Sequence, residues 1–372
     1  MKFKDRLTYK ATPIQVTVPA SAANLGPGFD ALALALELRD RYVAQILDEE
    51  LFDVDVAGEG ADEVKKDGKH LVIKSMMRGF EFMGGRPRGI ALRALNEIPH
   101  GRGLGSSAAA IVGGLSLARG LVLSGNSLMS DDDLIALATD LEGHPDNVAA
   151  AALGGATISW MEDRVGVPTG CAVRLNVDQR IRALVLIPSA QLSTGRARKM
   201  LPESVPHKDA TINSGRSALL VHALSVRPDL LFAATEDHLH QEYRREGMPR
   251  SVDLVKKLRG AGVAAMISGA GPSVLVLHAG STAEHDDIVR SAGEHFRPID
   301  LEVAERGIRR PAGASATRTR TRPTHPHAAG AVLSAVQAVR RGSSAHSRAA
   351  KPPLLCPSHG HDGDRGATAQ PR

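Results

Sequence analysis

The sequence predicts an α+β fold, because short segments with the period of strands are mixed with longer segments typical of buried helices. Residues 14–18 alternate apolar and polar side chains, as a half-buried strand does. Residues 106–123 are mostly small and aliphatic and contain no proline, which favours a buried helix. Glycine-rich turns recur at the ends of such segments, and they do not follow one regular strand–helix–strand series.

The N-terminal part is expected to be mainly strand. The first strand runs into a glycine- and proline-rich turn at residues 19–30. Residues 31–38 are apolar except for Glu37, so their period alone does not separate helix from strand. We favour a strand there, because residues 40–50 continue with a polar, hairpin-like pattern.

A second helix is expected at residues 131–141. Ser130 is a plausible N-cap, since its hydroxyl can accept a hydrogen bond from the first turn. The three aspartates that follow lie in that turn, where the helix dipole favours negative charge. The remaining predictions are strands at 156–160, 181–187, 263–267 and 274–277, an amphipathic helix at 251–259, and a weakly marked closing strand at 299–303.

The C-terminal tail differs in composition from the rest of the chain. After Ile308 apolar periodicity mostly disappears and aromatic residues are absent, so residues 310–372 are expected to form a disordered basic tail. One short helix at 329–339 is the exception that the pattern allows. The tail holds 10 Lys and Arg against 2 Asp and Glu, which leaves 36 basic and 39 acidic residues elsewhere. The net charge of +5 therefore belongs to the tail.

Composition excludes several classes of protein. The chain has no apolar signal region at its start and no segment long enough to cross a bilayer, so we expect a cytoplasmic protein without a membrane partner. Cys171 and Cys356 lie far apart and outside any metal-binding spacing. With 3% aromatic residues there is no stacking platform for single-stranded nucleic acid, and no nucleic-acid partner is expected.

A glycine-rich loop before the 106–123 helix is the first candidate for a binding site. Its glycines let the backbone approach a ligand closely, and the following helix start offers free N–H groups to a phosphate. It lacks the Gly-Lys-Ser/Thr ending of a Walker A loop, so positive charge must come from elsewhere. The expected cofactor-binding residues are Pro99, His100, Gly101, Arg102, Gly103, Leu104, Gly105, Ser106, Ser107 and Ala108.

Three segments together resemble the motifs of the GHMP kinases, which are small-molecule kinases. These are residues 19–30 (PASAANLGPGFD), the loop 99–108 (PHGRGLGSSA) and residues 267–273 (ISGAGPS). Within the family, 19–30 and 142–147 (EGHPDN) are most similar to members that phosphorylate L-homoserine. The resemblance implies a two-lobed fold, with an N-terminal lobe like domain 2 of ribosomal protein S5 (1–165), a ferredoxin-like C-terminal lobe (166–309) and the tail.

The resemblance also implies roles for individual residues, with ATP and Mg²⁺ as cofactors and L-homoserine as substrate. Ser107 and Glu142 would bind the metal. Arg198 and Arg244 match the family's segments for gripping the substrate carboxylate, and Arg196 lies close enough to Arg198 to leave that assignment open. The substrate-binding set is Asn24, His144, Asp146, Arg198 and Arg244, and the catalytic set is Ser106, Asn147 and Thr194.

The motif residues also bear on the mechanism of transfer. An asparagine at 147 cannot accept a proton, so we expect in-line transfer driven by positioning and charge stabilisation. The resemblance implies that residues 58–77 bind adenine, but no single residue in this segment is typical of a base-binding site. The alternatives are another GHMP kinase, or an inactive relative of the fold whose basic tail binds nucleic acid; a homodimer is also open.

Overall fold

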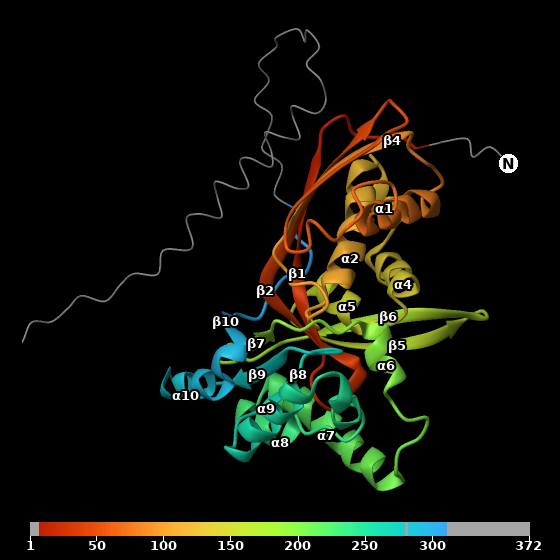
Figure 1. Cartoon of the computed structure of the whole chain (residues 1–372). Coiled ribbons are helices and arrows are strands. Elements are labelled where there is room, and N and C mark those ends of the chain that lie inside the picture. The colour runs from red at the N-terminus through yellow and green to blue at the C-terminus, as the bar shows by residue number, and fades with distance from the viewer. Residues whose placement is uncertain (1–6, 280–281, 311–372) are drawn as a thin grey trace, which may run out of the picture.

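A computed structural model describes residues 7–279 and 282–310, and it is an α+β fold built on two sheets (Figure 1). We call the six-stranded sheet with its helices the first lobe and the four-stranded sheet with its helices the second lobe. The predictions for the tail, including the helix at 329–339, lie outside the described residues. Within the described ranges, no helix is both long and apolar enough to cross a membrane.

The first sheet is organised around one long strand. Its strands are β1 (Ile14–Asn24), β2 (Gly28–Leu47), β3 (Phe52–Gly58), β4 (Gly89–Asn96), β5 (Ala156–Arg164) and β6 (Val167–Leu175), in the order β3-β4-β2-β5-β6 with β1 on β2. β2 is long enough to pair with β5 through 32–34 and with β4 through 41–47. The polar pattern at 40–50 is therefore mostly a continuation of β2, because both neighbours of this strand half are strands.

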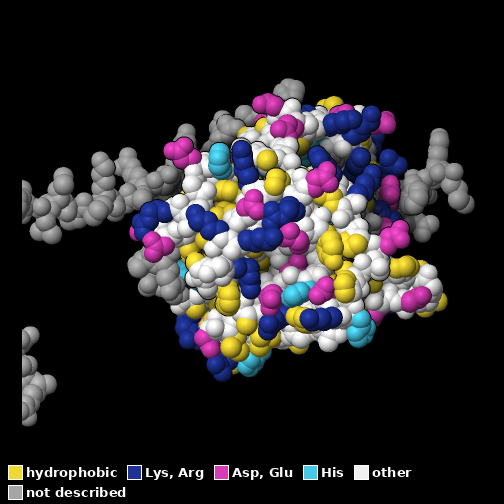
Figure 2. Space-filling model, turned by 60° about the horizontal axis from the view of Figure 1, so that its bottom comes forward, with side chains coloured by type: hydrophobic (Ala, Val, Ile, Leu, Met, Phe, Trp, Pro, Cys, Tyr) yellow, Lys and Arg dark blue, Asp and Glu magenta, His cyan; other side chains and the backbone are white. Residues whose placement is uncertain are grey.

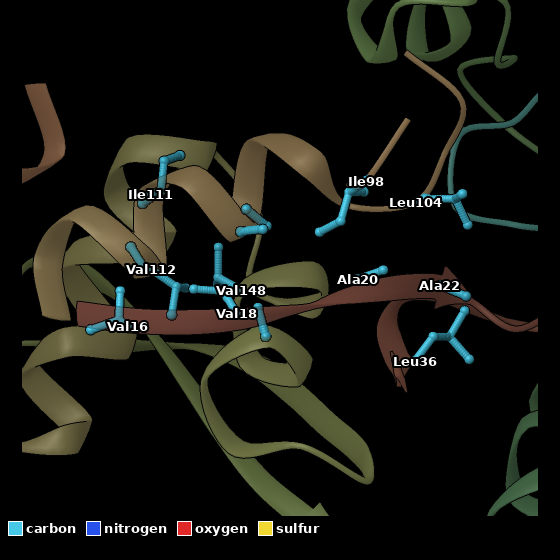
Figure 3. Packing of buried hydrophobic residues seen from close by; sticks show 14 of the residues in the cluster. Val16, Val18, Ala20, Ala22, Leu36, Ile98, Leu104, Ile111, Val112 and Val148 are labelled. Carbon is cyan, nitrogen blue, oxygen red and sulfur yellow. The ribbon is translucent and has the colours of Figure 1, made fainter. Parts of the chain in front are cut away.

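Helices cover one face of the first sheet (Figure 1). They are α1 (Leu71–Phe82), α2 (Ser106–Leu121), the short α3 (Gly125–Leu128), α4 (Asp131–Glu142) and α5 (Asp146–Leu153). Figure 3 shows Val16 and Val18 of β1 packed near Val112 of α2 and Val148 of α5. The start of α4 is as predicted, since Ser130 and Asp133 form a reciprocal capping box.

The second lobe has the strand order of a ferredoxin-like fold. Its strands are β7 (Arg182–Pro188), β8 (Ala265–Ile267), β9 (Val274–His278) and β10 (Phe296–Leu301), in the order β10-β7-β9-β8. Its α-helices are α6 (Thr194–Lys199), α7 (His207–Ser225), α8 (Leu231–Ala234), α9 (Pro249–Gly260) and α10 (Thr282–Ala292). Three 3₁₀ turns complete it: Pro228–Leu230, Glu242–Gly247 and Gly293–His295. The predicted fold class is confirmed.

The two lobes share a hydrophobic core. On one face of the second sheet, Val185 and Leu275 join the cluster that also contains the first-lobe residues Val18 and Leu36. On the other face, Leu186 and Val276 pack in a separate cluster with α9 and α10. Because both faces of the second sheet are buried, the lobes are held at a fixed junction rather than by a loose linker.

The predicted boundary at 165/166 falls on the turn between β5 and β6. These strands pair with each other along their whole length and belong to the first sheet. We propose to place the boundary between 176 and 181, where the chain leaves β6 and enters β7. The end of the second lobe returns to the first: the N–H of Arg309 donates to the Thr17 carbonyl at 2.9 Å.

A buried carboxylate holds the segment that leads into the glycine-rich loop. Asp40 of β2 is 1% exposed and accepts hydrogen bonds from the N–H groups of Glu97 and Ile98 and from the Tyr42 hydroxyl, at 2.7, 2.9 and 2.8 Å. Burial raises the pKa of Asp40 to about 6, although these hydrogen bonds act in the opposite direction. The negative charge is therefore held at a cost in free energy at neutral pH.

We expect Asp40→Asn to change the pH dependence of stability. Because the folded-state pKa is raised, the folded protein binds the proton more tightly than the unfolded chain does, and the stability that this confers is lost as pH rises through about 6. Relative to the variant, the wild type should lose roughly 2 kcal/mol of unfolding free energy between about pH 4 and pH 7. Urea unfolding across this range measures the difference, and parallel curves for the two proteins would contradict it.

Candidate functional site

A cavity of about 240 Å³ lies at the junction of the lobes, where the starts of α2 and α5 meet α6 and the turn after β8. All ten residues predicted for substrate, metal and catalysis line it: Asn24, Ser106, Ser107, Glu142, His144, Asp146, Asn147, Thr194, Arg198 and Arg244. They come from segments up to 220 positions apart. Their roles remain predictions, but the chain brings them to one place.

The backbone of the glycine-rich loop packs closely against Ser268 on one side and Ser21 on the other. Gly101, Gly103 and Gly105 have φ of 64°, 73° and 71°, in the left-handed region that favours glycine. A Cβ at Gly103 would lie 2.2 Å from the Ser268 carbonyl oxygen, and one at Gly105 would lie 2.0 Å from Ser21 Oγ. A side chain therefore does not fit at Gly103 or Gly105.

The end of this loop presents backbone donors to the cavity. Gly105 is the N-cap of α2, and no side chain caps the helix. The N–H groups of its first turn therefore keep their hydrogen-bonding capacity, next to the positive end of the helix dipole. This arrangement suits a phosphate group.

Three predicted loop residues do not line the cavity: His100, Arg102 and Ala108. The Arg102 guanidinium instead donates to the carbonyl oxygens of Pro188, Ser189 and His100, at 3.0, 2.7 and 2.7 Å. It ties the loop to the end of β7 rather than facing a ligand. Arg102 therefore does not supply positive charge to the phosphate end of the cavity.

Ser107 and Glu142 form the predicted metal pair. The Ser107 hydroxyl donates to Glu142 Oε2 at 2.6 Å, between the first turn of α2 and the last residue of α4. Burial raises the pKa of Glu142, although the bond from Ser107 opposes this. No group of three or more His, Cys, Asp or Glu that could hold a metal occurs among the described residues. One carboxylate and one hydroxyl fit Mg²⁺, which takes its other ligands from phosphate and water.

Asp146 and His144 form a second, buried pair at the start of α5. His144 Nδ1 lies 2.7 Å from Asp146 Oδ1, which also accepts the N–H of Asn147 at 2.7 Å. Burial alone would lower the pKa of His144, but the hydrogen bond to Asp146 and the charges of Asp146 and Glu142 outweigh it, so the pKa is raised. Asp146 Oδ2 has no hydrogen-bond partner among the described residues and is available to a cation.

Arg198 faces a carboxylate that the sequence reasoning missed. Its guanidinium donates to both oxygens of Asp30, at 3.0 and 2.6 Å, in the two-pronged geometry of a strong ion pair. Asp30 also lines the cavity. It ends the 19–30 segment that carried the family resemblance, so the signal was present. Arg196 lies exposed on the same helix and does not line the cavity, which favours Arg198.

Arg244 contacts His240 and Phe29, two residues that the sequence analysis did not assign to the site. It is 1% exposed and lies 3.0 Å from His240 Nδ1 through Nη1 and 5.5 Å from the Phe29 ring centre. Burial, and after it the charge of Arg198, lowers the pKa of Arg244 to about 10, so it stays charged at neutral pH. Burial also lowers the pKa of His240, whose neutral ring accepts from Arg244 and donates through Nε2 to the Gly26 carbonyl at 2.8 Å.

Asn24 and Thr194 are two uncharged residues of the predicted set that line the cavity. The Asn24 side chain donates to the Gly269 carbonyl at 2.8 Å and accepts the N–H of Asp30 at 3.0 Å. Its hydrogen bonds thus hold the turn that presents Asp30. Thr194 is the first residue of α6, directly after the N-cap Ser193.

Two family models and several known proteins match this chain. The family model "GHMP kinases N terminal domain" matches residues 70–155, and "GHMP kinases C terminal" matches residues 222–297. A homoserine kinase of Streptomyces coelicolor is 50% identical over 299 residues, covering 80% of this chain and 94% of that protein. One of Mycobacterium tuberculosis is 47% identical over 289 residues, covering 77% and 91%.

Solved structures extend the comparison to the fold. A crystal structure of homoserine kinase from Cytophaga hutchinsonii matches with a TM-score of 0.67 at 26% identity, covering 83% of this chain and 99% of that chain. Mevalonate diphosphate decarboxylase from Staphylococcus aureus matches with a TM-score of 0.54 at 15% identity, covering 80% and 98%, so the two share the fold alone.

Proposed function

Because the chain belongs to the GHMP kinase family, and within it to the homoserine kinases, we propose that it transfers the terminal phosphoryl group of ATP to the hydroxyl of L-homoserine. The product would be O-phospho-L-homoserine, an intermediate for threonine biosynthesis. One observation carries the proposal: the phosphate-type loop and a set of oppositely charged side chains open into the same cavity.

The charged side chains suit an amino acid with both charges. The Asp30–Arg198 pair is a carboxylate and a guanidinium facing each other, with Asp146 and Arg244 in the same lining. A bound amino acid can place its ammonium against a carboxylate and its carboxylate against an arginine, so each charge of the cavity finds a new partner. The hydroxyl then points to the loop end of the cavity.

Transfer would depend on position and electrostatics. Mg²⁺ held by Ser107 and Glu142 would neutralise charge on the phosphates. The free N–H groups at the start of α2 would bind the phosphoryl oxygens, and Asn147, Ser106 and Thr194 would surround the attacking hydroxyl. No group in this set needs to remove the proton before the bond to phosphorus begins to form, because the transition state is loose.

A panel of acceptors separates this proposal from another GHMP kinase activity. ADP release would be measured with L-homoserine, with 4-hydroxybutyrate, which lacks the ammonium, and with 3-aminopropan-1-ol, which lacks the carboxylate. Loss of either charge should lower kcat/KM strongly, because it leaves a buried charge of the cavity without a partner. Equal turnover of 4-hydroxybutyrate and homoserine would reject the assignment of substrate.

Removal of residues 311–372 separates a kinase from a tail-driven nucleic-acid binder. On the face shown in Figure 2, basic and acidic side chains are interspersed rather than gathered by sign. All residues that line the cavity lie between 24 and 270, outside the removed segment, so we expect the truncated protein to keep its kinase activity. Loss of the only measurable activity on truncation would favour the binding protein.

Arg198→Ala is expected to raise the KM for homoserine about tenfold to hundredfold, since a charge-assisted hydrogen-bonded contact contributes about 1.5–3 kcal/mol. The KM for ATP should change little. Arg196→Ala is the matched control, because Arg196 lies on the same helix but is exposed and outside the cavity lining. Steady-state kinetics with each substrate varied measures both KM values. Equal effects of the two substitutions would contradict a role of Arg198 in binding homoserine.

A further inference from the structure

Ser21 lies where three parts of the site meet: β1, the glycine-rich loop and α5. Its side chain is fully buried, at 0% exposure. Its Oγ lies 2.9 Å from Asn147 Oδ1, although the two residues are 126 positions apart. Its backbone N–H donates to the carbonyl oxygen of Leu104 at 3.0 Å. One residue therefore connects the loop to the amide that faces the reacting groups.

The Ser21 hydroxyl donates to the Asn147 amide oxygen at 2.9 Å. A hydroxyl can both donate and accept, and because it donates here, the NH₂ group with its two donors lies on the other side of the planar amide. The Asn147 side chain has no other hydrogen bond among the described residues, and the residue lines the cavity. The reverse orientation would direct the carbonyl oxygen at phosphate oxygens, which repel it.

We propose that Ser21 is a positioning residue for phosphoryl transfer, which holds the NH₂ group of Asn147 toward the cavity. There the amide donates to an oxygen of the phosphoryl group as its charge redistributes in the transition state. This inference rests on the proposed function. It assigns Asn147 the role of a hydrogen-bond donor, with Ser21 acting only through it.

The position of the loop supports this role. A Cβ at Gly105 would lie 2.0 Å from Ser21 Oγ and 3.1 Å from Asn147 Oδ1. The hydrogen bond thus lies against the backbone of the last loop glycine, at the helix end that suits phosphate. The donor that Ser21 orients is therefore close to the reacting end of a bound nucleotide.

A purely structural role for Ser21 would be to pack the loop, and Ser268 offers the comparison. Ser268 is also 0% exposed, and its hydroxyl donates to the Gly103 carbonyl at 2.7 Å. It has no hydrogen bond to Asn147 among the described residues. Ser268→Ala therefore removes a buried hydroxyl next to the loop, as Ser21→Ala does, without removing a contact to the Asn147 amide.

A double-mutant cycle on kcat tests the proposal in the full chain. Ser21→Ala is expected to lower kcat about tenfold with both KM values kept within about twofold, and Asn147→Ala about a hundredfold. The double variant should match Asn147→Ala, because Ser21 has no amide left to orient. The fold-changes in kcat from Ser268→Ala and Asn147→Ala should instead multiply in their double variant, since the two substitutions act independently.

Multiplication of the Ser21→Ala and Asn147→Ala effects would overturn the proposal, as would a Ser21→Ala effect confined to the KM for ATP. Circular dichroism checks folding, and Ser21→Cys replaces Ser21→Ala in the cycle if the alanine variant unfolds, because a thiol fills the site but donates weakly. A wild-type chain that binds ATP but leaves homoserine unphosphorylated would reject the proposed function. A multiplicative cycle in an active enzyme rejects the role of Ser21 alone.

Discussion

Glu142→Gln is expected to lower kcat by about a hundredfold or more, which corresponds to the several kcal/mol that a bound metal contributes to transition-state charge stabilisation. Glutamine keeps the shape of the side chain and can still accept from Ser107, whose hydroxyl lies 2.6 Å from the Glu142 carboxylate. What it removes is the negative charge that would hold Mg²⁺. The Mg²⁺ concentration needed for half-maximal rate should rise in parallel.

The control for Glu142 lies on the same helix. Asp140 is an exposed carboxylate of α4 that pairs with Arg78 at 3.6 Å and does not line the cavity. Asp140→Asn removes the same charge from the protein but should leave kcat nearly unchanged, because exposed pairs contribute little. Rates with Mg²⁺ titrated at saturating ATP measure both variants. An unchanged Mg²⁺ dependence of the rate in Glu142→Gln would contradict the assignment of Glu142 as a metal ligand.

Gly105→Ala is expected to abolish measurable ATP binding. The residue has φ of 71°, and an added Cβ would lie 2.0 Å from Ser21 Oγ, so the loop must move away from β1 and change the start of α2. The free N–H groups of this helix start would then no longer converge on a phosphate. Calorimetric titration with a non-hydrolysable ATP analogue and Mg²⁺ measures the loss.

Gly84→Ala separates backbone strain from this displacement. Gly84 also has a positive φ, of 93°, but a Cβ there meets nothing within 4 Å. The variant should lose about 1–2 kcal/mol of stability from the left-handed conformation and bind the ATP analogue normally. If Gly105→Ala were folded and bound the analogue as Gly84→Ala does, the phosphate-binding role of the loop would be wrong.

The charges of the site explain why it lies between the lobes. Asp30 and Asp146 belong to the first lobe, whereas Arg198 and Arg244 belong to the second. The attraction between Arg198 and Asp30 therefore also joins the lobes, and Arg102 joins them through the carbonyls of Pro188 and Ser189. A ligand that replaces the Asp30–Arg198 pair takes over this connection.

Local patterns predicted most of the elements, because the forces behind them act over a few residues. The capping box of Ser130 and Asp133 and the apolar run of β7 each involve neighbours in sequence, and both elements occur as predicted. The continuation of β2 through residues 40–47 was less clear, since its polar residues are covered by strands from elsewhere in the chain. The division at 165/166 likewise depended on pairing that the sequence does not display.

The sequence by itself determined the fold class, the glycine-rich loop and the residue types of the site, since turn chemistry and family motifs are local. Only the tertiary structure decided which groups face one another: that Asp30 meets Arg198, that His240 supports Arg244, that Ser21 meets Asn147, and that Arg102 turns away. The physical reason is that these are contacts over long separations, whose geometry follows from the packing of both lobes around a shared core.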